Sequence, residues 1–352
     1  MNDKLYLGID WHKNTSAWVA INEDREVVWE RKKVPCTVEE VQKAYHSLPK
    51  YKTIQAAIEP VCGWRWVTEE LERLGVAMKI ANPLKLRQIA ESSKKTDRQD
   101  AFALADVLRG GLLPESYMCS DDIFDLRKIA RTRAYLVSLR TGVKCRIHAL
   151  CTQKGLHVTS ERPLTKDGRD LLSKQGDMVI LQMFQTLDDL SRQITALESY
   201  MKEAIDRNDT MHLLMTMPGI GVISTISIFA EVGDFSRFPH HKALISYAGL
   251  NPRERSSGER QRLGRISKQG SSLLRYTMVE AALRVRDVDA SCNLYSFYRH
   301  LRETNKKPPM VARVALARKM LSCLWYMVHR NQPYIDTLLT SAQRRDDPAH
   351  VT

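Results

Sequence analysis

Residues 5–10 read Leu5-Tyr6-Leu7-Gly8-Ile9-Asp10, a short apolar run that ends in a carboxylate. Its length and its β-branched and aromatic side chains predict a strand. A second run of this kind, Thr53-Ile54-Gln55-Ala56-Ala57-Ile58, ends at Glu59. The chain therefore begins with two predicted strands that each place an acid at their carboxyl end.

Two further acids, Asp97 and Asp100, lie three residues apart in a stretch with strong helical character. That spacing puts both side chains on one helix face, whereas Asp106 falls on the opposite side at about 100° per residue. Four carboxylates from two strand ends and one helix face suit Mg²⁺ or Mn²⁺, and a pair of such ions promotes displacement at phosphorus. The plainer interpretation is a set of turn caps and a solvated helix face.

The order of the predicted elements favours the site. Three strands within residues 5–33 form an antiparallel meander, and helices then alternate with strands up to residue 109. This is the order of the ribonuclease-H-like (RuvC-like) α/β fold, which we assign to residues 1–112. In that fold the first and fourth strands are neighbours, so the two strand-end acids would meet at one edge of the sheet. The helix of Asp97 and Asp100 would pack across that edge.

The composition indicates a basic cytoplasmic protein. The 352 residues include 54 Lys and Arg against 41 Asp and Glu, a net charge of +13. This charge favours a polyanionic partner, nucleic acid before an anionic membrane, over a merely basic soluble protein. Seven cysteines form no Cys-x-x-Cys pair, and the N-terminus shows no signal peptide. The uncharged stretch 213–230 contains Pro218 and two glycines, so we predict no membrane segment.

Residues 121–208 are predicted to form a helical hairpin or coiled-coil arm with a loop at 155–168. In its second helix, apolar residues alternate four and three apart. They are Met183, Leu187, Leu190, Ile194, Leu197, Met201 and Ala204. In its first helix, apolar residues recur every seven positions. They are Ile129, Leu136, Val143 and Leu150. Arg133 and Arg140 interrupt this helix and are candidates for nucleic-acid contact. Two amphipathic helices packed on their own domain are an equal alternative.

Residues 211–340 are predicted to form a mainly helical C-terminal domain, with a disordered tail at 341–352. The domain opens with Pro218-Gly219-Ile220-Gly221 between two helical stretches. Gly219 and Gly221 there would present backbone N–H groups to a DNA phosphate, as in a helix-hairpin-helix element, or would form a simple αα turn.

A polar segment follows in which basic residues surround two adjacent serines, Ser256 and Ser257, just before a glycine. The basic residues are Arg253, Arg255, Arg262, Arg265 and Lys268. Such a segment could hold a hydroxyl nucleophile among phosphate-binding cations. No histidine is arranged with these serines, so the residues alone favour a plain phosphate-contacting loop. His12, beside Asp10, is interpreted as structural.

Taken together, these motifs resemble the DEDD transposases of the IS110 insertion-sequence family and its IS1111 subgroup, to which the pilin-segment invertases are related. The resemblance covers about residues 4–330. It rests on the following motifs in this order: Gly8-Ile9-Asp10, Ile58-Glu59-Pro60, Lys95-Thr96-Asp97-Arg98-Gln99-Asp100-Ala101, Pro218-Gly219-Ile220-Gly221, Tyr247-Ala248-Gly249-Leu250, Ser257-Gly258 and Gly264-Arg265-Ile266-Ser267-Lys268.

The resemblance implies a RuvC-like domain, a coiled-coil arm and a C-terminal transposase domain. In such proteins the four acids bind Mg²⁺, for which Mn²⁺ can substitute, and a serine forms a covalent phosphoserine with DNA. That serine corresponds to Ser257, with Ser256 as the fallback. The resemblance also implies donor and target DNA and a structured non-coding bridge RNA as partners. It further implies homodimers that pair into tetramers, and a bacterial, nucleoid-associated location.

Two alternatives stay open. One is a RuvC-like junction endonuclease that uses water as its nucleophile and forms no covalent intermediate. The other is a non-catalytic nucleic-acid-binding scaffold. An actin-like ATPase is disfavoured because Trp11-His12-Lys13 follows Asp10 in place of a glycine-rich phosphate turn.

Overall fold

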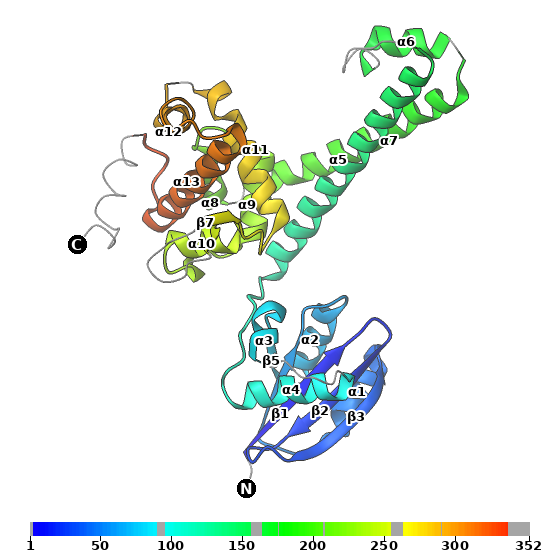
Figure 1. Ribbon diagram of the computed structural model, residues 1–352. Helices are drawn as coiled ribbons and strands as arrows, with labels where there is room; N and C mark the ends of the chain where they lie inside the picture. Colours follow the sequence, from blue (N-terminus) through cyan, green and yellow to red (C-terminus); the bar gives the residue numbers. More distant parts are fainter. Residues whose placement is uncertain are drawn as a thin grey trace, which may run out of the picture. The chain divides into compact units, whose positions relative to one another are not determined.

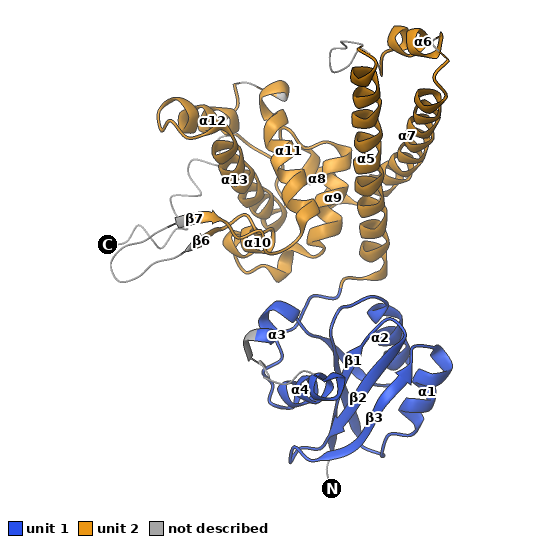
Figure 2. Ribbon diagram, turned by 45° about the vertical axis from the view of Figure 1, so that its right-hand side comes forward, with its two compact units in different colours: residues 1–118 blue, residues 119–352 orange. Residues whose placement is uncertain are grey.

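A computed structural model describes residues 3–89, 96–155, 164–174, 176–206, 208–254, 263–289 and 291–336 (Figure 1). The chain forms two compact units, residues 1–118 and residues 119–352 (Figure 2). The first is a mixed α/β unit and the second is mainly helical, which confirms the fold class at this level. The predicted arm and C-terminal domain both lie within the second unit.

The first unit is built on a five-stranded sheet with the order β3-β2-β1-β4-β5. The strands are β1 (Lys4–Trp11), β2 (Thr15–Ile21), β3 (Val27–Pro35), β4 (Thr53–Ile58) and β5 (Ala77–Ile80). β1, β2 and β3 form an antiparallel meander, whereas β4 and β5 run parallel to β1. The predicted meander and the adjacency of the first and fourth strands are therefore confirmed.

Helices cover both faces of this sheet. Alternate residues of β1, such as Leu7 and Ile9, pack in one core with α1 (Val38–His46) and α2 (Trp64–Arg73). The remaining residues of β1 point to the opposite face, because successive side chains of a strand alternate. Helices α3 (Pro83–Ile89) and α4 (Asp97–Arg109) contribute to the cores on that opposite face. Asp10 shares this face with Gly8.

Helix α4 lies directly against the backbone of β1. A Cβ atom added to Gly8 would lie 1.8 Å from the Ala101 carbonyl oxygen and 2.7 Å from the Ala105 nitrogen. Only glycine permits such an approach, and α4 meets it with two fully buried alanines. Close backbone contact therefore sets the height of α4 above the sheet.

Ion pairs at both ends of α4 fix its rotation. Near its start, Arg98 Nε lies 2.6 Å from Glu30 Oε2 of β3. Near its end, Asp106 pairs with Arg25 at 3.0 Å and with Arg109 at 3.1 Å. Asp106 therefore has a structural role in holding α4 and does not belong with the other acids.

In the second unit, the long helices α5 (Asp121–Gln153) and α7 (Met178–Ile205) pack together as the arm (Figure 1). The second helix of the predicted hairpin is interrupted: a short helix α6 (Lys166–Lys174) precedes α7. The interruption has a local cause, because Gly176 adopts a positive φ of 66° and Asp177 then caps α7 by accepting from the N–H groups of Val179 and Ile180.

The predicted heptad seam is displaced in register. On α5 the buried residues are Leu126, Ala130, Ile147 and Cys151, and the predicted residues are only half-buried. On α7 Leu187, Ile194 and Met201 are buried as predicted, but Phe184 and Ile205 replace Met183 and Ala204. Continued at heptad spacing, the observed seam passes through Arg133 and Glu198, whose side chains pair at 2.6 Å. An apolar pattern could not reveal a seam whose middle is polar.

The rest of the second unit is a helical body with one large core. Its elements are α8 (Asp209–Met215), α9 (Val222–Val232), α10 (His241–Tyr247), β6 (Pro252–Glu254), β7 (Leu263–Ile266), α11 (Ser272–Val288), α12 (Asn293–Glu303) and α13 (Pro309–Arg330). The arm joins this body through Arg131 of α5, which donates to both carboxylate oxygens of buried Glu231 in α9. None of the helices that the structure describes has the length and apolar character that crossing a membrane requires.

Gly8→Ala is expected to destabilise the first unit by about 2 kcal/mol or more, because its Cβ would collide with the backbone of α4. Urea unfolding followed by tryptophan fluorescence measures this, since five of the six tryptophans lie in residues 1–118. The control is Gly142→Ala in α5, where an added Cβ meets nothing within 4 Å. This control should leave the fluorescence transition unchanged, while helix propensity favours alanine by about 1 kcal/mol. An unchanged transition for Gly8→Ala would contradict the proposed role of the contact.

Candidate functional site

Asp10 lies near the end of β1, in an environment that disfavours its charge. Its side chain is 17% exposed, and its Oδ2 atom is buried without a hydrogen-bond partner among the described residues. The pKa of Asp10 is raised to about 6, first by burial and then by the charges of Asp100 and Asp97, while the charge of His12 acts to lower it. A cation beside Asp10 would relieve this penalty.

Glu59 lies at the same edge of the sheet. Ile9 and Ile58 are register partners in the parallel pair of β1 and β4, so Asp10 and Glu59 follow equivalent positions on neighbouring strands. Glu59 is half-buried. The structure therefore brings the two strand-end acids to one edge, as the fold predicted.

Asp97 and Asp100 occupy the first turn of α4. The helix begins there because the Thr96 side chain accepts a hydrogen bond from the Gln99 N–H and so caps the helix N-terminus. Asp97 is exposed and Asp100 is half-buried. Their influence on the pKa of Asp10 shows that both carboxylates lie near it.

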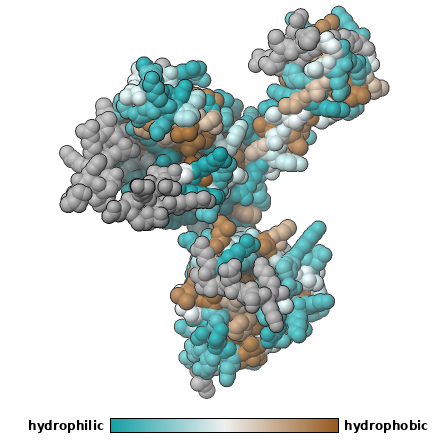
Figure 3. Space-filling model, viewed as in Figure 1, coloured by the Kyte–Doolittle hydropathy of each residue, from teal (hydrophilic) through white to brown (hydrophobic). Residues whose placement is uncertain are grey.

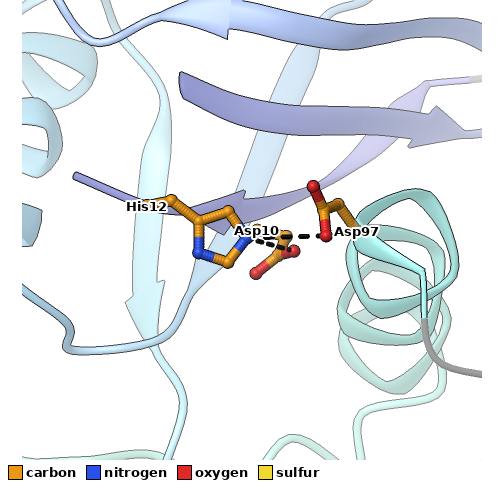
Figure 4. Close-up of side chains that lie close together, drawn as sticks. All are labelled: Asp10, His12 and Asp97. Carbon is orange, nitrogen blue, oxygen red and sulfur yellow. Dashed lines mark ion pairs between the residues drawn. The ribbon is translucent and has the colours of Figure 1, made fainter. Parts of the chain in front are cut away.

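His12 completes the cluster, although the sequence analysis gave it only a structural role. Its Nε2 atom lies 3.1 Å from Asp10 Oδ2 and 3.7 Å from Asp97 Oδ1, and Figure 4 shows this nitrogen directed at both carboxylates. The signal in the sequence was the two-residue separation from Asp10, because residues two apart at a strand end project to the same face.

These residues fit a divalent cation. One donor atom each from Asp10, His12 and Asp97 lies within 4.8 Å of the others. Two carboxylate oxygens and an imidazole nitrogen at this spacing are ligands that divalent metals accept. Asp10 Oδ2 supports the fit, since this buried atom has no hydrogen-bond partner among the described residues and its ion pair with His12 leaves it open to a metal ion. Asp100 and Glu59 border this group without belonging to it.

The two glycines of the predicted phosphate-binding turn differ in their surroundings. An added Cβ on Gly219 would lie 2.5 Å from the Ala281 carbonyl oxygen, so this buried glycine allows the turn to pack against α11. Gly221 is exposed at the start of α9, with open space beside it. Of the two, Gly221 is the one that a phosphate could approach.

The basic residues predicted to contact nucleic acid differ in whether they already pair with other groups of the protein. Arg133 pairs with Glu198 within the arm, and Arg253 donates to the Ser267 carbonyl oxygen at 3.1 Å. Arg140 is half-buried in α5, whereas Arg265 and Lys268 are exposed. Arg140, Arg265 and Lys268 thus remain available to a polyanion.

The predicted nucleophile Ser257 lies outside the described residues, as do Ser256, Arg255 and Arg262. These residues belong to 255–262, which connects β6 to β7 in the sequence. The described base of this two-stranded element is tightly anchored.

The anchor is a close crossing of two backbone segments. Ser267 N–H donates to the Asn251 carbonyl oxygen at 2.8 Å, and Lys268 N–H donates to the Gly249 carbonyl oxygen at 3.0 Å. A Cβ added to Gly270 would lie 1.9 Å from the Tyr247 carbonyl oxygen, so glycine is required there. The motifs around Gly249 and Lys268 therefore hold the base of the serine segment in place.

Two family models match this chain. The model for the DEDD transposase domain of IS110 elements matches residues 7–154, and that described as "Transposase IS116/IS110/IS902 family" matches residues 211–297. The chain carries the domains of the IS110-family transposases. The first match contains the four predicted acids and His12, and the second contains Gly219, Gly221 and Ser257.

Three curated relatives match this chain over 89% or more of their own length. The transposase for insertion sequence element IS1111A of Coxiella burnetii is 24% identical over 352 residues, covering 97% of this chain and 91% of that protein. A probable family 20 transposase of Pseudomonas aeruginosa is 25% identical over 306 residues, covering 84% and 89%. The pilin gene-inverting protein of Moraxella bovis is 26% identical over 360 residues, covering 94% and 98%.

Asp10→Asn is expected to stabilise the metal-free protein at neutral pH. The folded-state pKa of Asp10, about 6, exceeds its ordinary value of 3.8, so stability falls as pH rises between these values and stays lower above them. Replacing the carboxylate should recover on the order of 1–2 kcal/mol. Thermal denaturation in EDTA measures this gain.

The same variant should also lose the rise in melting temperature that Mn²⁺ gives the unmodified protein. Asp106→Asn is the matched control on α4, because Asp106 pairs with Arg25 and Arg109 and lies away from the cluster. It should lower stability and keep the response to Mn²⁺. A Mn²⁺ response retained by Asp10→Asn would exclude Asp10 as a ligand.

Proposed function

We propose that this protein is a Mg²⁺-dependent, RNA-guided DNA recombinase that moves an insertion sequence by serine-mediated strand exchange. The observation that carries the proposal is the meeting of Asp10 with Asp97 and His12 at one sheet edge, inside residues that match a DEDD transposase domain. The match of residues 211–297 to the second transposase domain supports the assignment of a separate nucleophile segment.

The first unit would take the ribonuclease-H-like role in this scheme. Its strand order, with parallel β4 beside β1 and α4 across β1, supports the RuvC-like assignment. Asp10, Glu59, Asp97 and Asp100 would hold Mg²⁺, with Mn²⁺ as a substitute. Such ions supply positive charge to the scissile phosphate and lower the pKa of an attacking hydroxyl.

Ser257 would attack the DNA phosphorus through its hydroxyl oxygen. A serine–phosphate ester bond forms, the bond from phosphorus to one deoxyribose oxygen breaks, and that oxygen leaves as a hydroxyl. The serine proton passes to solvent. Reversal of the same step with a different strand end would complete the exchange. Arg253, Arg255, Arg262, Arg265 and Lys268 would neutralise backbone phosphates around the serine.

Ser257→Ala is expected to abolish a covalent adduct between the protein and DNA, because the alanine has no hydroxyl to form the ester. The measurement is denaturing electrophoresis of reactions with labelled donor and target DNA, with the cofactor RNA present. Ser256→Ala is the neighbouring control and should retain the adduct. If the adduct persists in Ser257→Ala and disappears in Ser256→Ala, the nucleophile is Ser256.

A metal-dependent junction endonuclease is the alternative that a specific observation favours. The cluster of Asp10, His12 and Asp97 is assembled entirely within residues 1–118, so hydrolysis by water would need no serine. That activity would cleave junction DNA, form no adduct and tolerate Ser257→Ala. The adduct assay therefore separates the two functions.

The charge distribution supports nucleic-acid binding by the second unit. Residues 119–352 contain 36 basic and 24 acidic side chains, whereas residues 1–118 contain 18 and 17. From residue 126 to the end of α5 no acidic residue occurs. This basic surface would follow the backbones of donor DNA, target DNA and a structured bridge RNA, in the nucleoid of a bacterial cytoplasm.

RNA guidance predicts that one discrete RNA accompanies the protein. Purification from cells that carry the flanking DNA, followed by sequencing of the bound RNA, should return a structured transcript of the element's own non-coding end. Lowering the charge with Arg140→Gln and Lys268→Gln should weaken RNA retention as salt is raised. Recombination on bare DNA with no specific RNA bound would contradict guidance.

The arm supports the proposed assembly into homodimers. Tyr135 and Leu139 of α5 are 63% and 40% exposed. Tyr135 lies about 200° around the helix from Arg133, which pairs with α7, so it faces away from α7. Apolar surface is visible along the arm in Figure 3. A second copy would cover these side chains, and two such dimers would form the tetramer.

The double variant Tyr135→Glu/Leu139→Glu is expected to convert a dimer to a monomer, because it places charge in the proposed interface. Light scattering coupled to size-exclusion chromatography measures the mass of the nucleic-acid-free protein. Tyr276→Glu in α11 is the control, since Tyr276 is similarly exposed on the body of the unit. A dimer that survives the double variant would place the interface elsewhere.

A further inference from the structure

We infer that His12 is a nitrogen ligand of the divalent-metal site and that it biases this site toward Mn²⁺ over Mg²⁺. The inference deepens the proposed function and rests on its metal site. His12 is not one of the four acids, and a nitrogen ligand gives the site a preference among metal ions that oxygen ligands alone would not give.

The distances around His12 Nε2 fall between the shortest and the longest separations of donor atoms around one metal ion. Donors bound about 2.1 Å from an octahedral ion are about 3 Å apart when adjacent and about 4.2 Å apart when opposite. The 3.1 Å separation from Asp10 Oδ2 and the 3.7 Å separation from Asp97 Oδ1 lie in this range. One ion could therefore contact all three donor atoms without rearrangement of the backbone.

In the absence of a metal, the approach of His12 to Asp10 is an ion pair. Asp10 Oδ2 is buried without a hydrogen-bond partner among the described residues, although His12 Nε2 is only 3.1 Å away. The imidazole also lowers the pKa of Asp10, so attraction between the two groups holds both donor atoms where one ion could contact them. Figure 4 shows both atoms turned to the space beside Asp97, as two ligands of one ion would be.

The backbone around His12 is held on both sides. Buried Trp11 donates through its ring nitrogen to the Cys62 carbonyl oxygen at 3.1 Å. Cys36 Sγ lies 3.3 Å from the His12 carbonyl oxygen and donates to it. These contacts fix the strand end, while the imidazole itself, 51% exposed, can adjust to an ion.

The chemical consequence is a preference among metals. Mg²⁺ takes oxygen ligands almost exclusively, whereas imidazole nitrogen suits transition-metal ions, and Mn²⁺ accepts nitrogen and oxygen. A site with His12 as a ligand should bind Mn²⁺ more tightly than Mg²⁺. Loss of the imidazole should weaken Mn²⁺ binding about tenfold and change Mg²⁺ binding much less.

The test uses the full-length protein with Mn²⁺ as the probe. Titration followed by electron paramagnetic resonance counts bound Mn²⁺, and electron spin echo modulation detects a directly coordinated ¹⁴N nucleus. The unmodified protein should bind Mn²⁺ and show ¹⁴N coupling. His12→Gln should lose the coupling and bind about tenfold more weakly. His46→Gln, which changes an exposed histidine of α1, should behave like the unmodified protein.

His12→Asp separates ligation from folding. An aspartate at this position offers an oxygen ligand, so it should retain Mn²⁺, lose the ¹⁴N coupling and improve binding of Mg²⁺ relative to Mn²⁺. Bound Mn²⁺ without ¹⁴N coupling, or a coupling that persists in His12→Gln, would overturn the inference and leave the metal site standing. Failure of the unmodified protein to bind Mn²⁺ would overturn both.

Discussion

The candidate site depends on the contact between α4 and β1 at Gly8. The two backbones approach so closely that a single Cβ would lie 1.8 Å from the Ala101 carbonyl oxygen. Any side chain at this position would lift the helix from the sheet and move its first turn away from Asp10. The sequence supports the contact on both sides, with a glycine in the strand and buried alanines in the helix. Because the contact is made by backbone atoms, it fixes position within a few tenths of an ångström, which ligand geometry requires.

That contact has an electrostatic consequence. Bringing α4 onto β1 places the Asp97 and Asp100 carboxylates beside Asp10, whose pKa is already raised by burial. The fold thus concentrates negative charge where water is partly excluded, which destabilises the folded protein. Stabilising interactions elsewhere offset this cost. The pairs of Arg98 with Glu30 and of Asp106 with Arg25 act at the two ends of α4. A scaffold that tolerates unsatisfied acids in this way is characteristic of sites that take up a cation.

Much of this unit could be predicted from its sequence, for identifiable physical reasons. Short apolar runs that end in acids predicted the strands. The helical period predicted that Asp106 lies on a different face from Asp97 and Asp100. The order of the elements predicted that β1 and β4 are neighbours. The position of His12 beside Asp97 was not predicted, because its two-residue separation from Asp10 places it on the same face of the strand but does not show which helix lies over that face.

The packing of the arm was harder to predict because some of the residues along its helix–helix seam are charged and not apolar. At its two ends the observed seam is apolar, whereas its middle runs through Arg133 and Glu198. On α5 a pattern of apolar residues therefore selected the half-buried flank. Gly219 illustrates a related difficulty: glycine serves both close helix packing and phosphate binding, and the sequence does not show that Ala281 lies against this glycine.

The division of the chain into two units bears on how a serine without a base could react. No histidine occurs between His241 and His300, and the described base of the β6–β7 element is engaged in backbone contacts. In the proposed mechanism, activation of Ser257 would come from outside its own segment. In that mechanism, the acids of the first unit and the metal ion proposed for them would supply it. A nucleophile kept on one unit and its activating ions on the other would react only when the nucleic acid brings them together, in one chain or between copies. Separation of this kind would restrain cleavage until an assembled substrate is present.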